Sequence, residues 1–232
     1  MGDDLDNSAR DHLVAITRGA VNAVPFVGGL LGELVTATIP RQRQDRIATY
    51  LRKVEERLAT FEAAEAKAAL QNPEKIDLIE AGGYLAVRAT NAERIRQIAD
   101  VVAHGLARDD ADVIRRKRLL SLLGEIDDDE VAILSAYGQS YGGNAAAAWE
   151  KIDRPTPAGL GGGRALVEEN QLFELGTNHL LRLNLLERRF NIKKGQVPEL
   201  DPKTGLPKSS IQISYLGRML LRSMGVNLPY ED

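Results

Sequence analysis

The segment 176–224 constrains the fold more than any other part of this 232-residue chain. Leucine-rich helical spacing fills its first part, and only after Phe190 does the sequence alternate as strands do. The segment predicts helix, strand, loop, strand and helix in that order, with the helices over 177–187 and 216–224 and the strands over 189–193 and 210–214. The C-terminal part must therefore fold as a helix, a hairpin and a second helix.

This order of elements resembles the end of a winged-helix domain. In that family the helix before the wing ends in leucine, a small residue and leucine, and the closing helix begins near a glycine–arginine pair. The matching residues here are Leu183, Asn184 and Leu185, followed by Leu216, Gly217 and Arg218. The resemblance covers less than half of the chain, and it implies a fold without implying an activity.

The first 140 residues carry helical periodicity. Apolar residues recur every three or four positions from Ile47 to Phe61, which is the spacing of one buried helix face. Residues that favour helix starts then divide this part, and they are Pro40, Asn72 before Pro73, Asn91, Asp110 and Asp127.

The predicted fold is mainly α, with an antiparallel helical bundle followed by a winged-helix-like α+β module that contains a short β-hairpin. The boundaries are a bundle over 1–140, a Gly/Pro linker over 141–163 and the module over 164–232. The helix predicted over 128–139 is compatible with either part.

Composition narrows the class of protein. Hydrophobic residues make up 44% and charged residues 27% of the chain, as in soluble globular proteins. The chain has no cysteine, which excludes a disulfide scaffold, a thiolate zinc site and a cysteine nucleophile, and suits the cytoplasm. The acidic start is not that of a secretory signal. A net charge of −3 supplies no overall attraction to nucleic acid.

The segment 20–39 is apolar and rich in glycine, and arginines follow it. Gly28 and Gly32 are four residues apart, a spacing that lets helices approach closely. This favours a tightly packed helical hairpin in the bundle or a contact in a homo-oligomer. An anionic membrane surface is the alternative, while Pro25 and Glu33 argue against a membrane span. The residues expected at either contact are Phe26, Gly28, Gly29 and Gly32.

Polar residues of the module are candidates for nucleic-acid binding, because the helix before the wing enters the major groove in such folds. These candidates are Asn178, His179, Arg182, Arg189, Lys193 and Lys194. From residue 164 onward, however, ten Lys and Arg residues face eight Asp and Glu residues, a charge of about +2 that is small for a phosphate-binding protein. Winged helices also bind proteins, so the partner is a protein or a nucleic acid.

A second basic group consists of Arg115, Arg116, Lys117 and Arg118. These residues could contact phosphate groups. We favour the alternative that they form a solvated helix face on which Asp112 pairs with Arg115 and Arg116. No motif indicates a catalytic residue, a cofactor or a metal site, and His12, His104 and His179 lie far apart in the sequence.

The layout also resembles uncharacterised bacterial helical proteins such as the abortive-infection alpha family. The residues concerned are the segment 24–46, Arg94, Ala99, Gly105, Leu106, Asp128, Asp129 and Glu130. This resemblance implies a role in phage defence. The leading hypothesis is a non-enzymatic bacterial interaction protein. The alternatives are a DNA-binding transcription regulator dimerised by its bundle and a membrane-acting defence effector that uses segment 20–39.

Overall fold

The protein is described by a computed structural model, and the chain divides into two compact units. The described residues are 41–232 without 62, 108–109, 141–144, 151, 153, 157–162, 194–196, 203–204 and 230–232. The first unit runs to Glu125 and includes Ser223–Gly225, and the second comprises Ile126–Arg222 and the residues from Val226. The two units divide after Glu125, and the sequence predicts the end of the bundle at residue 140.

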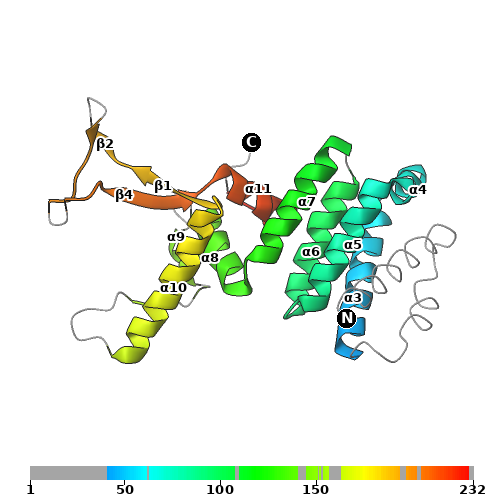
Figure 1. The fold of residues 1–232 in the computed structure, drawn as a ribbon, viewed down its shortest axis with the longest axis horizontal. Helices are drawn as coiled ribbons and strands as arrows, with labels where there is room; N and C mark the ends of the chain where they lie inside the picture. The colour runs from blue at the N-terminus through cyan, green and yellow to red at the C-terminus, as the bar shows by residue number, and fades with distance from the viewer. Residues whose placement is uncertain are drawn as a thin grey trace, which may run out of the picture. The chain divides into compact units, whose positions relative to one another are not determined.

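The first unit is a helical bundle (Figure 1). Its helices are α3 (Arg41–Leu58), α4 (Ala63–Gln71), α5 (Pro73–Arg88), α6 (Ala92–Leu106) and α7 (Asp110–Glu125). Helix α6 contacts α3, α5 and α7, and nearly all of its residues after the first turn are buried. The apolar core of the unit therefore gathers around α6.

Two asparagines start helices in this bundle, as the sequence predicts. The Asn72 side chain accepts hydrogen bonds from the backbone N–H groups of Glu74 and Lys75, and Pro73 occupies the first helical position. The Asn91 side chain accepts from the N–H of Arg94 in the same way. The predicted start at Pro40 lies outside the described residues.

Small residues allow the bundle helices to approach closely. A Cβ atom added at Gly82 of α5 would overlap the Tyr50 hydroxyl and lie 2.7 Å from Val102 Cγ2. The fully buried Tyr50 hydroxyl donates to the Ile79 carbonyl at 2.8 Å, and burial raises the pKa of this phenol. The helices α3 and α5 therefore pack closely, and the buried hydroxyl group at their contact has a hydrogen-bond partner.

The second unit contains the helices α8 (Asp128–Gln139), α9 (Ala145–Glu150), α10 (Arg164–Arg182) and α11 (Tyr215–Ser223). Asp127 and Glu130 form a reciprocal capping box at the start of α8. Helix α8 contacts α9, α10 and the strand β4 (Ser209–Ile213), so it belongs with the C-terminal elements. The segment 141–163, which the sequence predicts as a Gly/Pro linker, contains the short helix α9.

Helix α10 ends earlier and begins earlier than predicted. It starts at Arg164 and ends at Arg182, whereas the sequence predicts a helix over 177–187. Asn184 adopts the left-handed conformation with φ 56°, and this turns the chain out of the helix. The leucines that extend the helical pattern, Leu185 and Leu186, are buried in that turn and in the following strand.

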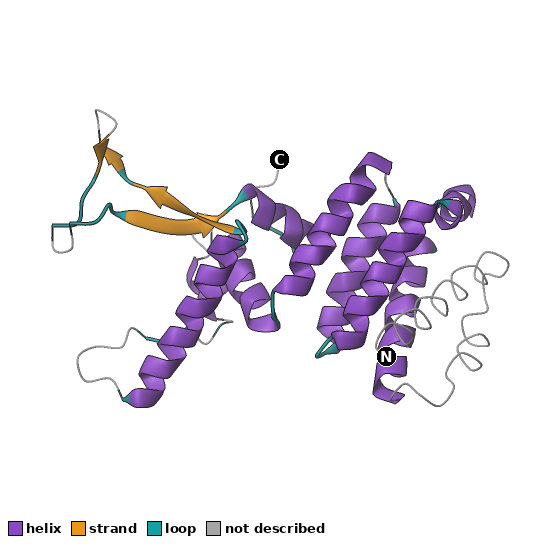
Figure 2. Cartoon of the chain, in the orientation of Figure 1, coloured by secondary structure: helices purple, strands orange, loops and turns teal. Residues whose placement is uncertain are grey.

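The strands form a hairpin arm, residues 186–213, that Figure 2 shows as a narrow two-stranded element. Strand β1 (Leu186–Phe190) pairs antiparallel with β4, and Leu186 lies opposite Ile213. Farther along the arm, β2 (Ile192–Lys193) pairs antiparallel with β3 (Val197–Pro198). The predicted strands over 189–193 and 210–214 thus exist, but β1 begins three residues earlier. The mainly helical fold with a small antiparallel hairpin is confirmed.

Ser214 joins the arm to the closing helix α11. Its hydroxyl accepts from the N–H of Gly217 at 3.0 Å and donates to the Asn184 carbonyl at 2.6 Å. A Cβ atom at Gly217 would overlap the Leu185 carbonyl oxygen, so the start of α11 is packed directly on the turn after α10.

Candidate functional site

The outward face of α10 is the most distinctive exposed surface of the second unit. Leu180 and Thr177 are buried on the inner side of the helix, and Gly176 packs against α8. On the outer side Leu172 is 67% and Leu175 65% exposed. The two leucines are three residues apart, so they lie on one side of the helix and form a single apolar patch.

Two of the nucleic-acid candidates share this face. Asn178 and Arg182 are four residues apart on α10, and both are exposed. Arg189 is exposed on β1 opposite Ser210, on a different element. Lys194 and the side chain of Lys193 lie outside the described residues. The described candidates therefore fall on two elements, and only one pair of them lies on the same helix face.

His179 does not face the solvent with the other candidates. Its Nδ1 lies 2.6 Å from Oε1 of Glu130, and both side chains are largely buried. The other carboxylate oxygen of Glu130 accepts from the backbone N–H of Asp127 in the capping box. His179, a predicted nucleic-acid contact, therefore ties α10 to the start of α8.

The hairpin arm carries apolar side chains that the sequence analysis did not single out. On one side of the β1–β4 pair, buried Leu186 and Ile213 are followed by half-buried Ile211 and then by Phe190, which is 47% exposed. Ile192, Leu200 and Leu206 are also exposed farther along the arm. The alternation of side chains along a strand predicts this apolar side of the arm. Leu186 and Phe190 are four residues apart, so they point to the same face of β1.

An aromatic cluster joins Trp149, from the stretch that the sequence predicts as linker, to residues of α8 and α10. The rings of Tyr137 and Trp149 meet edge to face with centroids 4.9 Å apart, and Phe173 of α10 lies next to Trp149. The guanidinium of Arg154 stands 4.8 Å from the Trp149 ring, within cation–π distance. Burial raises the pKa of the Tyr137 hydroxyl, and the charge of Arg154 opposes that shift. The cluster anchors α9 to α8 and α10.

The basic group on α7 does not form one patch. Consecutive helical residues turn by about 100° from one to the next, so only Arg115 and Arg118, which are three positions apart, lie on the same side. Lys117 pairs with Asp77 of α5 at 3.2 Å, Arg116 packs beside Gly105, and Arg115 and Arg118 are exposed. The expected partner Asp112 has a side chain outside the described set.

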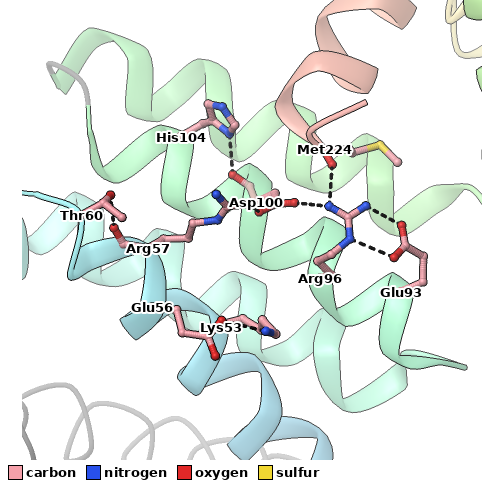
Figure 3. A network of polar contacts seen from close by, with 9 residues as sticks. All are labelled: Lys53, Glu56, Arg57, Thr60, Glu93, Arg96, Asp100, His104 and Met224. Carbon is pink, nitrogen blue, oxygen red and sulfur yellow. Dashed lines mark hydrogen bonds and ion pairs between the residues drawn. The ribbon is translucent and has the colours of Figure 1, made fainter. Parts of the chain in front are cut away.

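A buried carboxylate organises the polar contacts of the first unit (Figure 3). Asp100 is 2% exposed, and its two oxygens accept from Arg57 of α3 and Arg96 of α6, each at 2.6 Å. Arg96 also binds Glu93, and hydrogen bonding to Arg96 lowers the pKa of that carboxyl. No sequence motif indicates this network, since Asp100 is one polar residue within the apolar run of α6. Its contacts join elements of the bundle.

Other predicted features lie partly or wholly outside what the structure describes. Segment 20–39, with Phe26, Gly28, Gly29 and Gly32, belongs to the residues before 41. Within the described ranges, no helix is long and apolar enough to span a membrane. Among the same residues, no group of three or more His, Asp or Glu side chains could hold a metal ion.

Comparison with family models, curated proteins and solved structures found no match for this chain.

Proposed function

We propose that the chain is a non-enzymatic interaction protein whose second unit binds a protein partner through the outward face of α10. One observation carries this proposal: Leu172 and Leu175 are both about two-thirds exposed on the same side of one helix. Burying a leucine side chain stabilises a complex by about 1.5–3 kcal/mol. An apolar helix face of this kind is what helix-in-groove and helix-pairing partners recognise.

The order of elements supports a winged-helix-like module. Helix α10, the turn at Asn184, the β1–β4 hairpin and α11 follow one another as the helix, wing and closing helix do in that family. In this module α10 takes the place of the helix that enters DNA in nucleic-acid-binding relatives. Leucines stand at the middle of its outer face, where a phosphate-binding helix would carry polar or basic residues.

The hairpin arm supports the same role. Phe190 is about half exposed beside the buried pair Leu186 and Ile213, so the apolar core of the unit continues onto the surface of the arm. Aromatic side chains with large exposed area are frequent anchors in protein interfaces. The arm therefore supplies a second apolar element for the partner.

A second candidate function is duplex DNA binding, as in a transcription regulator. The observation that favours it is the exposure of Asn178 and Arg182 on α10 and of Arg189 on the arm. Asn and Arg side chains are able to read base edges. The weak charge of about +2 after residue 164 argues against it, because duplex binding depends on several phosphate contacts.

Comparison of two variants in affinity capture tests the proposal. Leu175→Glu places a charge in the apolar patch of α10, and Ile114→Glu makes the same change at a 56% exposed position of α7. We expect wild type and Ile114→Glu to capture the same protein from cells that express the chain, and Leu175→Glu to lose it. Equal capture by all three chains would contradict the proposal.

Fluorescence anisotropy with labelled duplexes tests the DNA alternative. We expect no binding at about 150 mM salt, because few phosphate contacts are available. Tight binding that weakens steeply with salt and loses its sequence preference in Arg182→Ala would support the regulator instead.

The resemblance to the abortive-infection alpha family supports phage defence as the biological setting of this role in a bacterial cytoplasm. A plaque assay tests that setting. We expect cells with the wild-type chain to resist at least one phage and cells with Leu175→Glu to lose the resistance. Sensitivity to every phage of a broad panel would count against it.

A further inference from the structure

Two arginines of the second unit approach the side chain of Tyr137, and the first of them belongs to the hairpin arm. Side chains alternate along β1, so Arg188 points to the same face of the arm as Leu186, which lies opposite Ile213. This face packs on α8, because a Cβ atom added at Gly138 would lie 3.2 Å from Cδ1 of Ile213. Arg188 therefore lies on the side of the arm that covers α8.

The second arginine belongs to the chain after α9. The rings of Tyr137 and Trp149 have centroids 4.9 Å apart, and the guanidinium of Arg154 stands 4.8 Å from the centroid of the same Trp149 ring. Burial raises the pKa of the Tyr137 hydroxyl, and the positive charges of Arg154 and Arg188 both oppose that shift. The two guanidinium groups therefore act on one phenol.

The hydrogen-bond donors of this cluster are available. The Arg154 guanidinium stands over the rings of Trp149 and Phe173, which position the cation and offer no oxygen acceptor to its N–H groups. Among the residues that the structure describes, the side chains of Arg154 and Arg188 and the hydroxyl of Tyr137 have no hydrogen-bond or ion-pair partner. Two like charges beside one phenol repel each other, and a bound anion would remove that repulsion.

We propose that Tyr137, Arg154 and Arg188 form a binding site for a phosphate monoester. Such a group carries about −1.5 to −2 charges at neutral pH and has three strong acceptor oxygens. Two guanidinium groups and a phenol O–H match that charge and supply the donors, whereas a carboxylate or a phosphodiester carries a single charge. The ester belongs to a small molecule or to a phosphorylated side chain. The inference goes beyond the proposed function, since none of the three groups is part of the apolar patch on α10.

Calorimetric titration of the full chain with methyl phosphate tests the site. We expect methyl phosphate to bind, and dimethyl phosphate, which has one charge, to bind about tenfold more weakly or less tightly still. Trp149 is the only tryptophan of the chain, so its fluorescence should change over the same range of methyl phosphate concentrations. No binding of methyl phosphate, or equal binding of the two compounds, would overturn the proposal.

Single substitutions test whether the binding occurs at this cluster. Arg154→Gln and Arg188→Gln should each weaken it about tenfold, and Tyr137→Phe about threefold, since charged hydrogen bonds contribute more than neutral ones. Arg189→Gln is the matched control, because it removes the same charge from the opposite face of β1 and should bind as the wild type does. Circular dichroism checks that each variant is folded. Wild-type affinity in both Arg154→Gln and Arg188→Gln, or an equal loss in Arg188→Gln and Arg189→Gln, would overturn the site.

Two further ligands distinguish the sources of the phosphate. Adenosine monophosphate and a mixture of peptides with a central phosphoserine are titrated beside methyl phosphate. Tighter binding of the phosphopeptides would assign the site to a phosphorylated protein side chain, and tighter binding of the nucleotide would assign it to a small molecule. Equal binding of all three esters would support a site for the phosphate group alone. Equal binding of the phosphopeptides and their unphosphorylated forms would overturn the proposal.

Discussion

Asp100 shows how one buried charge ties helices together. A carboxylate that is 2% exposed must have its negative charge and its oxygen lone pairs satisfied by the protein. Arg57 and Arg96 provide this from two helices while their own side chains stay 54% and 37% exposed. The arginines therefore retain part of their hydration, which makes the network less costly to form than a fully buried pair.

Replacing Asp100 with Asn should destabilise the first unit by about 2 kcal/mol, since it removes charge-assisted hydrogen bonds from two guanidinium groups. Urea unfolding followed by circular dichroism measures the loss. Asp77→Asn is the control, because its pair with Lys117 is exposed and should contribute about 0.5 kcal/mol or less. Equal effects of the two changes would show that Asp100 does not organise the bundle.

Glu93 should make stability depend on pH in the acid range. Hydrogen bonding to Arg96 holds its pKa below the usual value of 4.5, so the folded state binds this proton more weakly than the unfolded state. The stabilisation is present above about pH 4.5 and is lost as the pH falls through the lower folded pKa. In urea unfolding, Glu93→Gln should be less stable than wild type at neutral pH, and the difference should shrink on acidification. A difference that grows as the pH falls would contradict this.

Among the secondary-structure elements, the sequence predicts where several helices begin, but it does not predict where α10 ends. The capping residues bond to backbone groups within one helical turn, so the sequence nearby is enough to predict a helix start. They are Asn72, Asn91 and the pair Asp127 and Glu130. The end of α10 depends on the left-handed residue Asn184 and on the burial of the leucines around it. Because leucines at helical spacing continue past that point, periodicity alone extends the helix too far.

The junction between the hairpin arm and α11 should be sensitive to a single methyl group. Gly217→Ala would bring a Cβ atom onto the Leu185 carbonyl oxygen, and we expect a loss of about 2 kcal/mol from overpacking. Gly163→Ala is the matched control, because no atom lies within 4 Å of its added Cβ atom, and it should change stability by about 0.5 kcal/mol or less. Comparison of the two urea midpoints checks this, and an unaffected Gly217→Ala would show that the junction is loose.

For the whole molecule, composition predicts a Gly/Pro linker over 141–163, whereas the two compact units divide after Glu125. The grouping of α8 with the C-terminal elements depends on side-chain contacts that no local pattern contains. Gly138 of α8 packs against Leu221, Leu228 and Ile213, all from the C-terminal end of the chain. The sequence identifies Asn178 and Arg182 as candidate contacts on α10, but it does not single out the exposed residues Leu172 and Leu175.

A fragment test follows from this division. We expect residues 126–232 to fold on their own, because they retain α8 and α9 with their apolar contacts. Residues 164–232 should not fold, because the surfaces of α10 and β4 that α8 covers would be exposed to water. Amide dispersion in NMR spectra distinguishes the two fragments. A well-folded 164–232 fragment would instead support the predicted boundary.

Photo-crosslinking at position 175 reports the class of molecule that lies against α10 and so tests the proposed protein-binding role of this helix. A photoreactive amino acid replaces Leu175 in one chain and Ile114 in a control chain, and irradiation follows in cells that express them. We expect a protease-sensitive protein adduct from position 175 and none above background from position 114. A nuclease-sensitive adduct at position 175, or equal labelling at both positions, would contradict it.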